Sequence, residues 1–335
     1  MTIHKKFTVL PSKEQVKKSV SFSFINNFED IKEDYHEQDG GLVGHRGDKA
    51  FYRVDSESLK SLIEELQNNP DCGYVTNAND VIKDGVVPQK LSAMIKQLRW
   101  DSDSYNESLS EELIINEVLS SQILNYFGCP TSYNTAVKVK NEENMDEFQL
   151  LSVDFVPFGT KFETFDEYSC RIIDSVEYTV ENLRKQMFSM MGKVPDENSE
   201  KFVEDFVYSY LVRKYVINDH DFFHINAGVL SDESLQMQYL NFDFEFCFYS
   251  EFPNLRRGNI KQVKEDLIYV EKNFPRVYDI FVKKLNIFSH ELKRLINNNE
   301  IEYLSKYHKF VVEEEIMDNV SNLEFLMRTL TPIKE

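Results

Sequence analysis

The hydrophobic pattern of this chain changes near residue 160, and this change limits the folds it can adopt. Upstream, short apolar runs alternate with polar turns, which is typical of strands. Downstream, apolar residues recur three and four positions apart over residues 175–192, 199–217, 260–274 and 278–298, which predicts helices. We therefore expect an α+β fold with a β-rich N-terminal lobe (1–160) and a mainly helical C-terminal lobe (161–335).

The first half also carries specific strand and helix signals. The apolar run KLSAMIKQLRW (90–100) favours a strand, and TAVKVK and FQLLSVDFVPF flank the acidic turn NEENMDE, which indicates a β-hairpin. Residues 56–69 and 111–127 have helical spacing. For the second helix we expect Ser110 as the N-cap and Gly128 as the stop.

Composition excludes several classes of protein. Acidic residues outnumber basic ones by 57 to 38, so the net charge of −19 opposes binding to nucleic acid. No apolar run reaches the ~18 residues of a membrane-spanning helix, and the first residues lack the apolar core of a signal peptide. The four cysteines are too widely spaced for a zinc site or a disulfide scaffold. We expect a cytoplasmic protein with no nucleic-acid or membrane partner, and secretion into a host cell stays open.

The segment YLVRKYVINDHDFFHINAGVL places several polar residues between two apolar runs. Asp221 is followed five residues later by Asn226, a spacing that suits phosphotransfer, in which the Asp accepts a hydroxyl proton and the Asn holds a metal ion. Asp219 is the alternative base. Asp243 follows a later apolar run and offers a second metal ligand. The competing interpretation is an Asx-rich loop that caps a helix.

These residues resemble the catalytic segment of the HipA-like protein kinases, a D-x-x-x-x-N-x-G loop followed by an apolar strand that ends in Asp. The pattern is carried here by Asp221, Asn226, Gly228 and Asp243. The small CtkA-like bacterial Ser/Thr kinases are closest, because KFVEDFVYSYLVRKYVI and EKNFPRVYDIFVKKLN are similar to the segments on either side of their loop. The resemblance spans residues 90–298. It implies a two-lobed kinase-like fold, ATP and Mg²⁺ as cofactors, a protein Ser or Thr as acceptor, autophosphorylation as one option, and an antitoxin or regulatory protein as a partner.

The resemblance also assigns roles in the N-terminal, nucleotide-binding lobe. The helix at 111–127 is similar to the regulatory helix, with Glu117 holding the phosphate-binding Lys96, and Arg99 is the competing cation. Outside the resemblance, Lys96 and Glu117 are interpreted as surface charges. The segment LLSVDFVPFG resembles the hinge on which adenine rests, and its adenine-binding residues are Asp154, Phe155 and Val156.

One departure from the family bears on activity. Phe222 and Phe223 stand where the family has Arg-His, so a pseudokinase that binds nucleotide or a protein without phosphotransfer is the alternative function. His220 or His224 are candidates to replace the missing His. Two stretches, DGGLVGHRGDK and DGVVPQK, are alternative phosphate loops. The clusters NEENMDE and VVEEEIMD are interpreted as solvated acidic faces.

Overall fold

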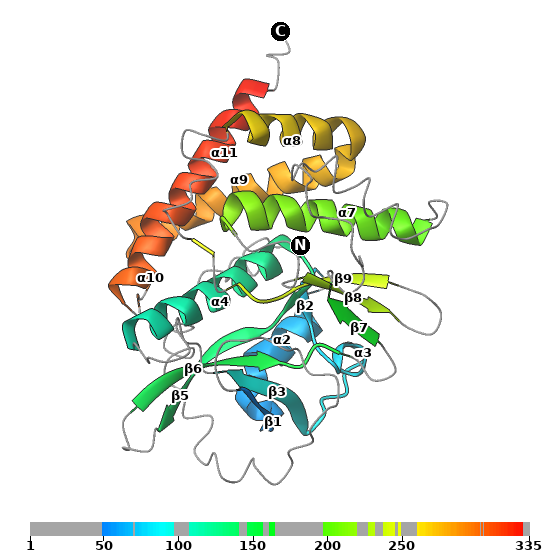
Figure 1. Cartoon of the computed structure of the whole chain (residues 1–335), viewed down its shortest axis with the longest axis vertical. Coiled ribbons are helices and arrows are strands. Elements are labelled where there is room, and N and C mark those ends of the chain that lie inside the picture. Colours follow the sequence, from blue (N-terminus) through cyan, green and yellow to red (C-terminus); the bar gives the residue numbers. More distant parts are fainter. Residues whose placement is uncertain are drawn as a thin grey trace. The chain divides into compact units, whose positions relative to one another are not determined.

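The structure is a computed structural model and describes residues 49–69, 71–96, 107–140, 146–156, 161–164, 197–219, 227–231, 237–244, 247–248, 260–301, 303 and 305–330. The chain divides into two compact units. The first comprises Met1–Phe158 and Ile301–His308, and the second comprises Gly159–Glu300 and Lys309–Glu335. Figure 1 follows the elements along the sequence.

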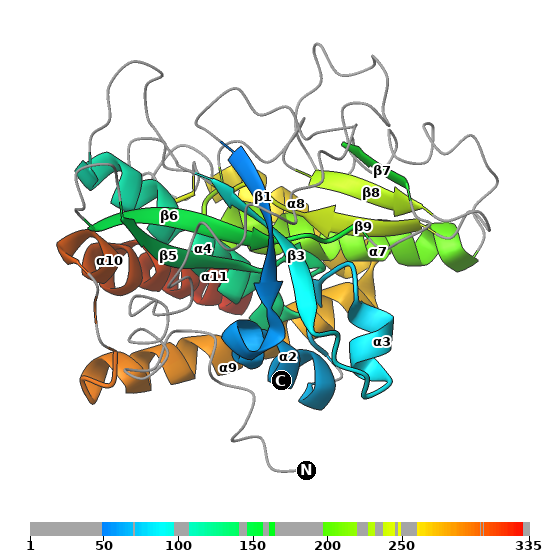
Figure 2. The ribbon, with the colours of Figure 1, turned by 90° about the horizontal axis from the view of Figure 1, so that it is seen from below.

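The first unit is built on an antiparallel sheet of four strands in the order β1-β3-β6-β5. These strands are β1 (Lys49–Asp55), β3 (Lys90–Lys96), β6 (Asp146–Val153) and β5 (Asn134–Lys140). Strand pairing places β3 between β1 and β6, and Figure 2 shows these strands from below. The predicted strand at 90–100 is confirmed over residues 90–96, beyond which the chain lies outside the described residues, and the pairing of β5 with β6 confirms the predicted hairpin.

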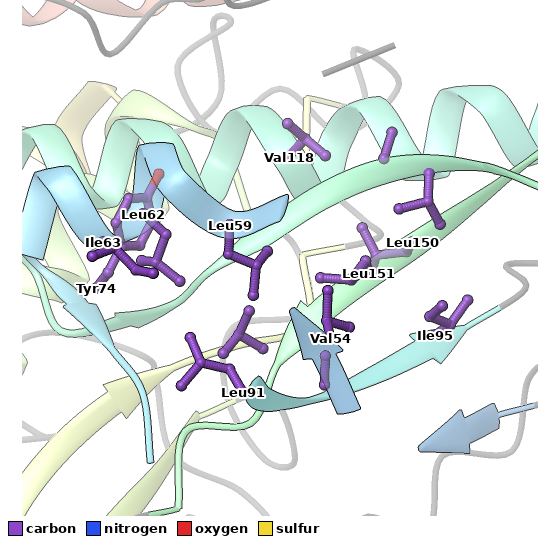
Figure 3. Packing of buried hydrophobic residues seen from close by; sticks show 14 of the residues in the cluster. Val54, Leu59, Leu62, Ile63, Tyr74, Leu91, Ile95, Val118, Leu150 and Leu151 are labelled. Atoms are coloured by element: carbon purple, nitrogen blue, oxygen red, sulfur yellow. The ribbon is translucent and has the colours of Figure 1, made fainter. Parts of the chain in front are cut away.

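Helices pack on this sheet around one apolar cluster. The 3₁₀ helix η3 (Ser56–Leu59) leads into α2 (Lys60–Asn68), which confirms the predicted helix at 56–69. Figure 3 shows Leu62 and Ile63 of α2 in the same cluster as Leu91 of β3 and Leu150 of β6. Val118 of the long helix α4 (Glu107–Phe127) belongs to it as well. Short elements complete the unit: β2 (Tyr74–Val75), which pairs in parallel with β4 (Thr131–Ser132), and α3 (Asn79–Lys83).

Helix α4 confirms the predicted stop but not the predicted start. Gly128 has a φ of 77°, and its N–H donates to the Asn125 carbonyl at 2.9 Å while the Cys129 N–H donates to the Leu124 carbonyl at 2.9 Å. This is a Schellman motif, in which glycine tolerates the left-handed conformation. The expected N-cap at Ser110 is wrong, because the helix already begins at Glu107 and Ser110 lies inside its first turns.

The second unit contains three antiparallel strands, β7 (Lys161–Thr164), β8 (Ala227–Ser231) and β9 (Met237–Asn241), with β8 between the other two. Its other described elements are helices, as predicted: α7 (Glu197–Leu211) continues into the π-helical turn η4 (Val212–Val216), and α8 (Ile260–Asn273) and α9 (Pro275–Asn297) follow. Pro275 is the first residue of α9, where its missing N–H costs no hydrogen bond.

The C-terminal helices correct the interpretation of VVEEEIMD as a solvated face. The chain forms α10 (Lys306–Phe310), η5 (Val311–Ile316) and α11 (Met317–Leu330). Val311, Val312 and Ile316 are fully buried and Glu315 is only 4% exposed, whereas Glu314 faces solvent. Acidic residues alternate here with apolar residues that the core requires, so only part of the cluster is solvated. No described helix has the length and apolar character that crossing a membrane would require.

A buried carboxylate connects α8 to the end of α7. Asp266 is 2% exposed and accepts hydrogen bonds from Tyr210 Oη at 2.9 Å, from Tyr215 Oη, and from Gln262 Nε2 at 3.1 Å. Several donors compensate for the lost hydration of a carboxylate. Asp266 therefore stabilises the junction from which the chain continues toward the predicted catalytic loop.

The segment Ile301–His308 belongs to the first unit, although the chain has already formed most of the second. Tyr307 Oη donates to Asn116 Oδ1 of α4 at 2.8 Å, and the His308 ring packs edge-on against Tyr303 at 5.5 Å. His308 is 1% exposed, and burial lowers its pKa to about 4. The buried imidazole is thus neutral at physiological pH.

This pKa predicts a dependence of stability on pH. The folded pKa lies below the unfolded value, so the contribution is complete above about pH 6.5 and is lost as the pH falls toward 4. Between pH 7.5 and pH 5, the wild type should lose about 2 kcal/mol more free energy of unfolding than His308→Gln. Urea unfolding followed by circular dichroism measures both. Equal losses in the two proteins would show that His308 is accessible to protons in the folded state.

Candidate functional site

Two charged side chains that the resemblance singled out are buried in the first unit. Lys96, the last residue of β3, is 5% exposed, and Glu117, in the middle of α4, is 1% exposed. The alternative interpretation of both as surface charges is therefore wrong. Burying a charged group is unfavourable unless it is paired or hydrogen-bonded, so such positions usually have a specific role.

Strand register places Lys96 and Asn134 on the same face of the sheet. Met94 of β3 pairs with Ser152 of β6, and Ser152 pairs in turn with Asn134 of β5. Paired residues point to the same face, and so do residues two positions apart on a strand. Asn134 Nδ2 donates a hydrogen bond to Glu117 Oε2 at 2.9 Å. The face that carries Lys96 is therefore the face to which Glu117 is bonded.

Helix α4 is fixed to its surroundings by polar side chains spaced four residues apart. After Glu117, Ser121 Oγ donates to the Ser132 carbonyl at 2.7 Å and accepts from the Asn134 N–H at 3.3 Å. One turn further on, Asn125 Oδ1 accepts from the Gly73 N–H at 2.7 Å. Three successive turns of α4 are thus bonded to loops and strands of the same unit (Figure 1).

The predicted hinge follows β6, and its polar groups are largely engaged within the chain. The Asp154 N–H donates to the Ser92 carbonyl at 2.9 Å, and the Asp154 carbonyl accepts from the Asn77 N–H at 2.7 Å. The Val156 N–H donates to Asp154 Oδ1 at 3.0 Å. Burial raises the pKa of the Asp154 carboxyl, and the Val156 N–H partly offsets this shift. An adenine read by Val156 would have to displace the Asp154 carboxylate, while Phe155 is buried beside them.

The glycine of DGVVPQK has a structural explanation. Gly85 has a φ of 86° and follows α3, where its N–H donates to the Ile82 carbonyl at 3.0 Å and the Val86 N–H donates to the Val81 carbonyl at 2.8 Å. This is again a Schellman motif. Most of the other candidate loop, DGGLVGHRGDK, and the competing cation Arg99 lie outside the described residues.

In the second unit the structure describes Gly228 and Asp243 of the predicted motif. Asp221, Asn226, the Phe222-Phe223 pair and both loop histidines lie outside the described residues. Gly228 of β8 pairs with Thr164 of β7, and a Cβ at this position would lie 2.3 Å from the Phe162 ring. Any other residue would clash, so the motif glycine is required by close packing between two strands.

Asp243 lies two residues beyond β9, and β9 is held firmly against α7. Tyr239 contacts the Phe206 ring edge-on at 5.4 Å, and Asn241 Nδ2 donates to Ser209 Oγ at 3.1 Å. Asp243 itself is half-buried and has a φ of 57°. The predicted order of strand, strand and acidic residue is thus confirmed for β8, β9 and Asp243.

A fully buried ion pair joins the entry of the predicted catalytic loop to the Asp243 turn. Arg213, in η4, has 0% exposure; its Nε donates to Asp219 Oδ2 at 2.6 Å, and a terminal nitrogen donates to the same oxygen. The guanidinium also donates a long hydrogen bond of 3.5 Å to the Asp243 carbonyl and lies 4.8 Å from the centroid of the Phe244 ring. Burial acts to lower the pKa of Arg213, but the carboxylate of Asp219 outweighs it and raises that pKa.

This pair bears on the alternative base, Asp219. A carboxylate that binds a guanidinium at two nitrogens, and is itself 3% exposed, is poorly placed to accept a proton from a substrate hydroxyl. Asp219 is therefore engaged in the fold, and the role of Asp221 stays a prediction. The sequence analysis did not identify Arg213, and an arginine inside the apolar run YLVRKYVI with an Asp six residues later was the available signal.

Unusual backbone conformations gather around the same pair. Asn218, Asp243 and Phe248 have φ values of 50°, 57° and 62°. Asn and Asp adopt this conformation more readily than other residues with a side chain, so the cost of about 1–2 kcal/mol falls mainly on Phe248. The Phe248 N–H donates to the Ile217 carbonyl at 3.1 Å, so the three positions belong to one connected region. Such strain is concentrated at functional sites more often than elsewhere.

Comparison with known proteins supports the fold. No protein-family model and no curated protein sequence matches this chain. Among solved structures it is similar to the proinflammatory kinase CtkA of Helicobacter pylori, with a TM-score of 0.52 and 12% sequence identity, over 89% of this chain and 97% of that kinase. At this identity the similarity shows the fold alone. The chain thus has a kinase-like α+β fold, while its two-lobed arrangement and its membership of the HipA-like family stay predictions.

The ion pair predicts a specific pattern of stability. Arg213→Met leaves Asp219 buried without its guanidinium partner and should lower the free energy of unfolding by about 3–5 kcal/mol. The double variant Arg213→Met/Asp219→Leu removes both charges and should recover most of this loss. Denaturant unfolding measures all three proteins.

A matched control is Arg294→Met, which breaks two solvent-accessible ion pairs, one with Glu291 on α9 and one with Glu300 beyond the end of that helix. Because solvent screens these pairs, their removal should change stability little. If Arg213→Met were equally mild, the buried pair would not hold this region together.

Proposed function

We propose that this chain is a protein Ser/Thr kinase related to the HipA-like kinases, which transfers the γ-phosphate of ATP to a protein hydroxyl. The main support for the proposal is that Lys96 on strand β3 and Glu117 on helix α4 are both buried, within a kinase-like fold. In protein kinases a strand lysine contacts the α- and β-phosphates and a helix glutamate fixes it. A protein with a net charge of −19 needs such a local cation to hold a triphosphate.

In the first unit we assign phosphate binding to Lys96 and its orientation to Glu117. Asn134 and Ser121 support this assignment, because they hold α4 against the sheet with Glu117 buried. We assign binding of the adenine edge to Asp154, Phe155 and Val156. Since the Val156 N–H is bonded to the Asp154 carboxylate in this structure, adenine binding there would require that carboxylate to turn away.

In the second unit we assign the base to Asp221 and the metal ligands to Asn226 and Asp243. Oxygen ligands suit Mg²⁺, which would supply positive charge to the β- and γ-phosphates. The half-buried Asp243 fits this role, because β9 and the Arg213 contact fix its main chain. Among the described residues, no group of three His, Cys, Asp or Glu side chains forms a metal site, so Asn226 and substrate phosphates would have to complete the coordination.

The second candidate function is a pseudokinase, which the Phe222-Phe223 pair favours. In this case the chain binds nucleotide or a protein partner and transfers nothing. Binding and transfer must therefore be measured separately. Restoring the family residues with Phe222→Arg/Phe223→His would show whether this pair limits the chemistry.

The test is an ATP-binding titration with and without Mg²⁺, followed by transfer of radiolabelled γ-phosphate to the chain itself and to a general protein substrate. Asp243→Ala should abolish Mg²⁺-dependent binding. Asp221→Ala should leave binding largely intact and remove transfer, because a base acts in the transition state. Lys96→Met should weaken ATP binding.

Lys90→Met is the matched control for Lys96→Met, since Lys90 begins the same strand β3 and faces solvent. It should behave as the wild type. Binding without transfer in the wild type would favour the pseudokinase. Failure to bind ATP at any Mg²⁺ concentration would contradict the kinase and a nucleotide-binding pseudokinase.

A further inference from the structure

Asn134 is a buried amide that belongs to no part of the family motif. It is the first residue of β5 and is 3% exposed. A carboxylate only accepts hydrogen bonds, so the group that faces Glu117 Oε2 at 2.9 Å has to be the amide nitrogen. The orientation of the amide therefore follows from chemistry, and it directs Oδ1 away from Glu117.

Asn134 Oδ1 accepts no hydrogen bond from any residue that the structure describes. A buried acceptor without a donor is unfavourable, and native proteins seldom retain one without a reason. The position of the residue itself is firmly fixed, because the Asn134 N–H donates to Ser121 Oγ on α4. The open acceptor thus lies at a rigid point beside Glu117.

The donor with the right chemistry on this face of the sheet is Lys96. It follows Met94 on β3, and Met94 lies in the same cross-strand row as Asn134 through Ser152. Its ammonium has three N–H donors, so it can bind a carboxylate, an amide oxygen and a phosphate oxygen at once. Lys96 is also nearly fully buried, which favours partners within the protein over water.

We propose that Asn134 is a positioning residue that aims Lys96 at the nucleotide. Its Nδ2 fixes the Glu117 carboxylate, and its Oδ1 accepts a hydrogen bond from the Lys96 ammonium when ATP is bound. This inference rests on the proposed function, in which Lys96 holds the phosphates. Asn134 would then be a neutral residue that binds both Lys96 and Glu117, and through it both would be connected to the start of β5.

The test is a double-mutant cycle in the full chain with kcat/KM for ATP as the readout. Asn134→Leu removes both amide groups at similar volume and should lower kcat/KM about 10- to 100-fold, because the ammonium loses its fixed position. In a Lys96→Met background the same substitution should have little further effect. Losses that multiply independently would overturn the proposal, since Asn134 would then act through stability alone.

A swapped pair provides a conservative rescue. Asn134→Asp places two carboxylates together and should be impaired, while Glu117→Gln/Asn134→Asp restores one amide and one carboxylate beside Lys96. The double variant should recover at least about tenfold in kcat/KM over Asn134→Asp. No recovery would count against the contact.

Asn125→Leu is the matched control, because it removes a different buried amide, located on α4, that bonds to Gly73 and Glu65. It should lower the melting temperature and leave the KM for ATP unchanged.

A readout without phosphotransfer separates this inference from the proposed function. With Mg²⁺ and a non-hydrolysable ATP analogue bound, the pKa of Lys96, followed by NMR of the ¹³C-methylated side chain and assigned with Lys96→Arg, should be lower in Asn134→Leu than in the wild type, because an acceptor of the ammonium is lost. An unchanged pKa in this complex would overturn the role of Asn134 alone. A wild type that does not bind the analogue would overturn the proposed kinase function, and the contact with it.

Discussion

A carboxylate that leaves water must find hydrogen-bond donors or a cation, and this requirement shapes both units of the chain. In the first unit Glu117 is buried on α4 and bonded to Asn134. In the second, Asp219 is buried against the guanidinium of Arg213. Glu117 is bonded to the sheet face that carries Lys96, and Asp219 holds Arg213, whose guanidinium contacts the Asp243 carbonyl. The polar groups that stabilise the fold are thus the ones that position the proposed chemistry.

This arrangement bears on how the proposed kinase would be regulated. Glu117, Ser121 and Asn125 attach three successive turns of α4 to the first unit, and Asn116 is bonded to Tyr307 from the segment that returns late in the chain. The three bonds from Glu117, Ser121 and Asn125 are buried, so moving α4 would leave buried polar groups without partners. We therefore expect α4, and Glu117 with it, to stay beside the sheet.

Much of the fold followed from hydrophobic spacing. Local periodicity predicted the strands β3, β5 and β6 and the helices α2, α7, α8 and α9. It also predicted that two strands, β8 and β9, precede Asp243. Ser110 failed as an N-cap because the helix continues upstream of it, and VVEEEIMD failed as a solvated face because valine and isoleucine within it are needed by the core. The Arg213–Asp219 pair left a signal that was missed, an arginine within an apolar run with an Asp six residues later, whereas the Asn134–Glu117 bond joins a strand to a helix and depends on tertiary packing that no local spacing encodes.

The central claim is that Lys96 is a phosphate-binding residue. A crystal structure of the full chain with Mg²⁺ and a non-hydrolysable ATP analogue tests this most directly. The account predicts that Lys96 Nζ lies within hydrogen-bond distance of an α- or β-phosphate oxygen, with the Glu117 carboxylate also within reach of the ammonium. An analogue bound with Lys96 directed away from its phosphates, or with another cation in that place, would contradict the account.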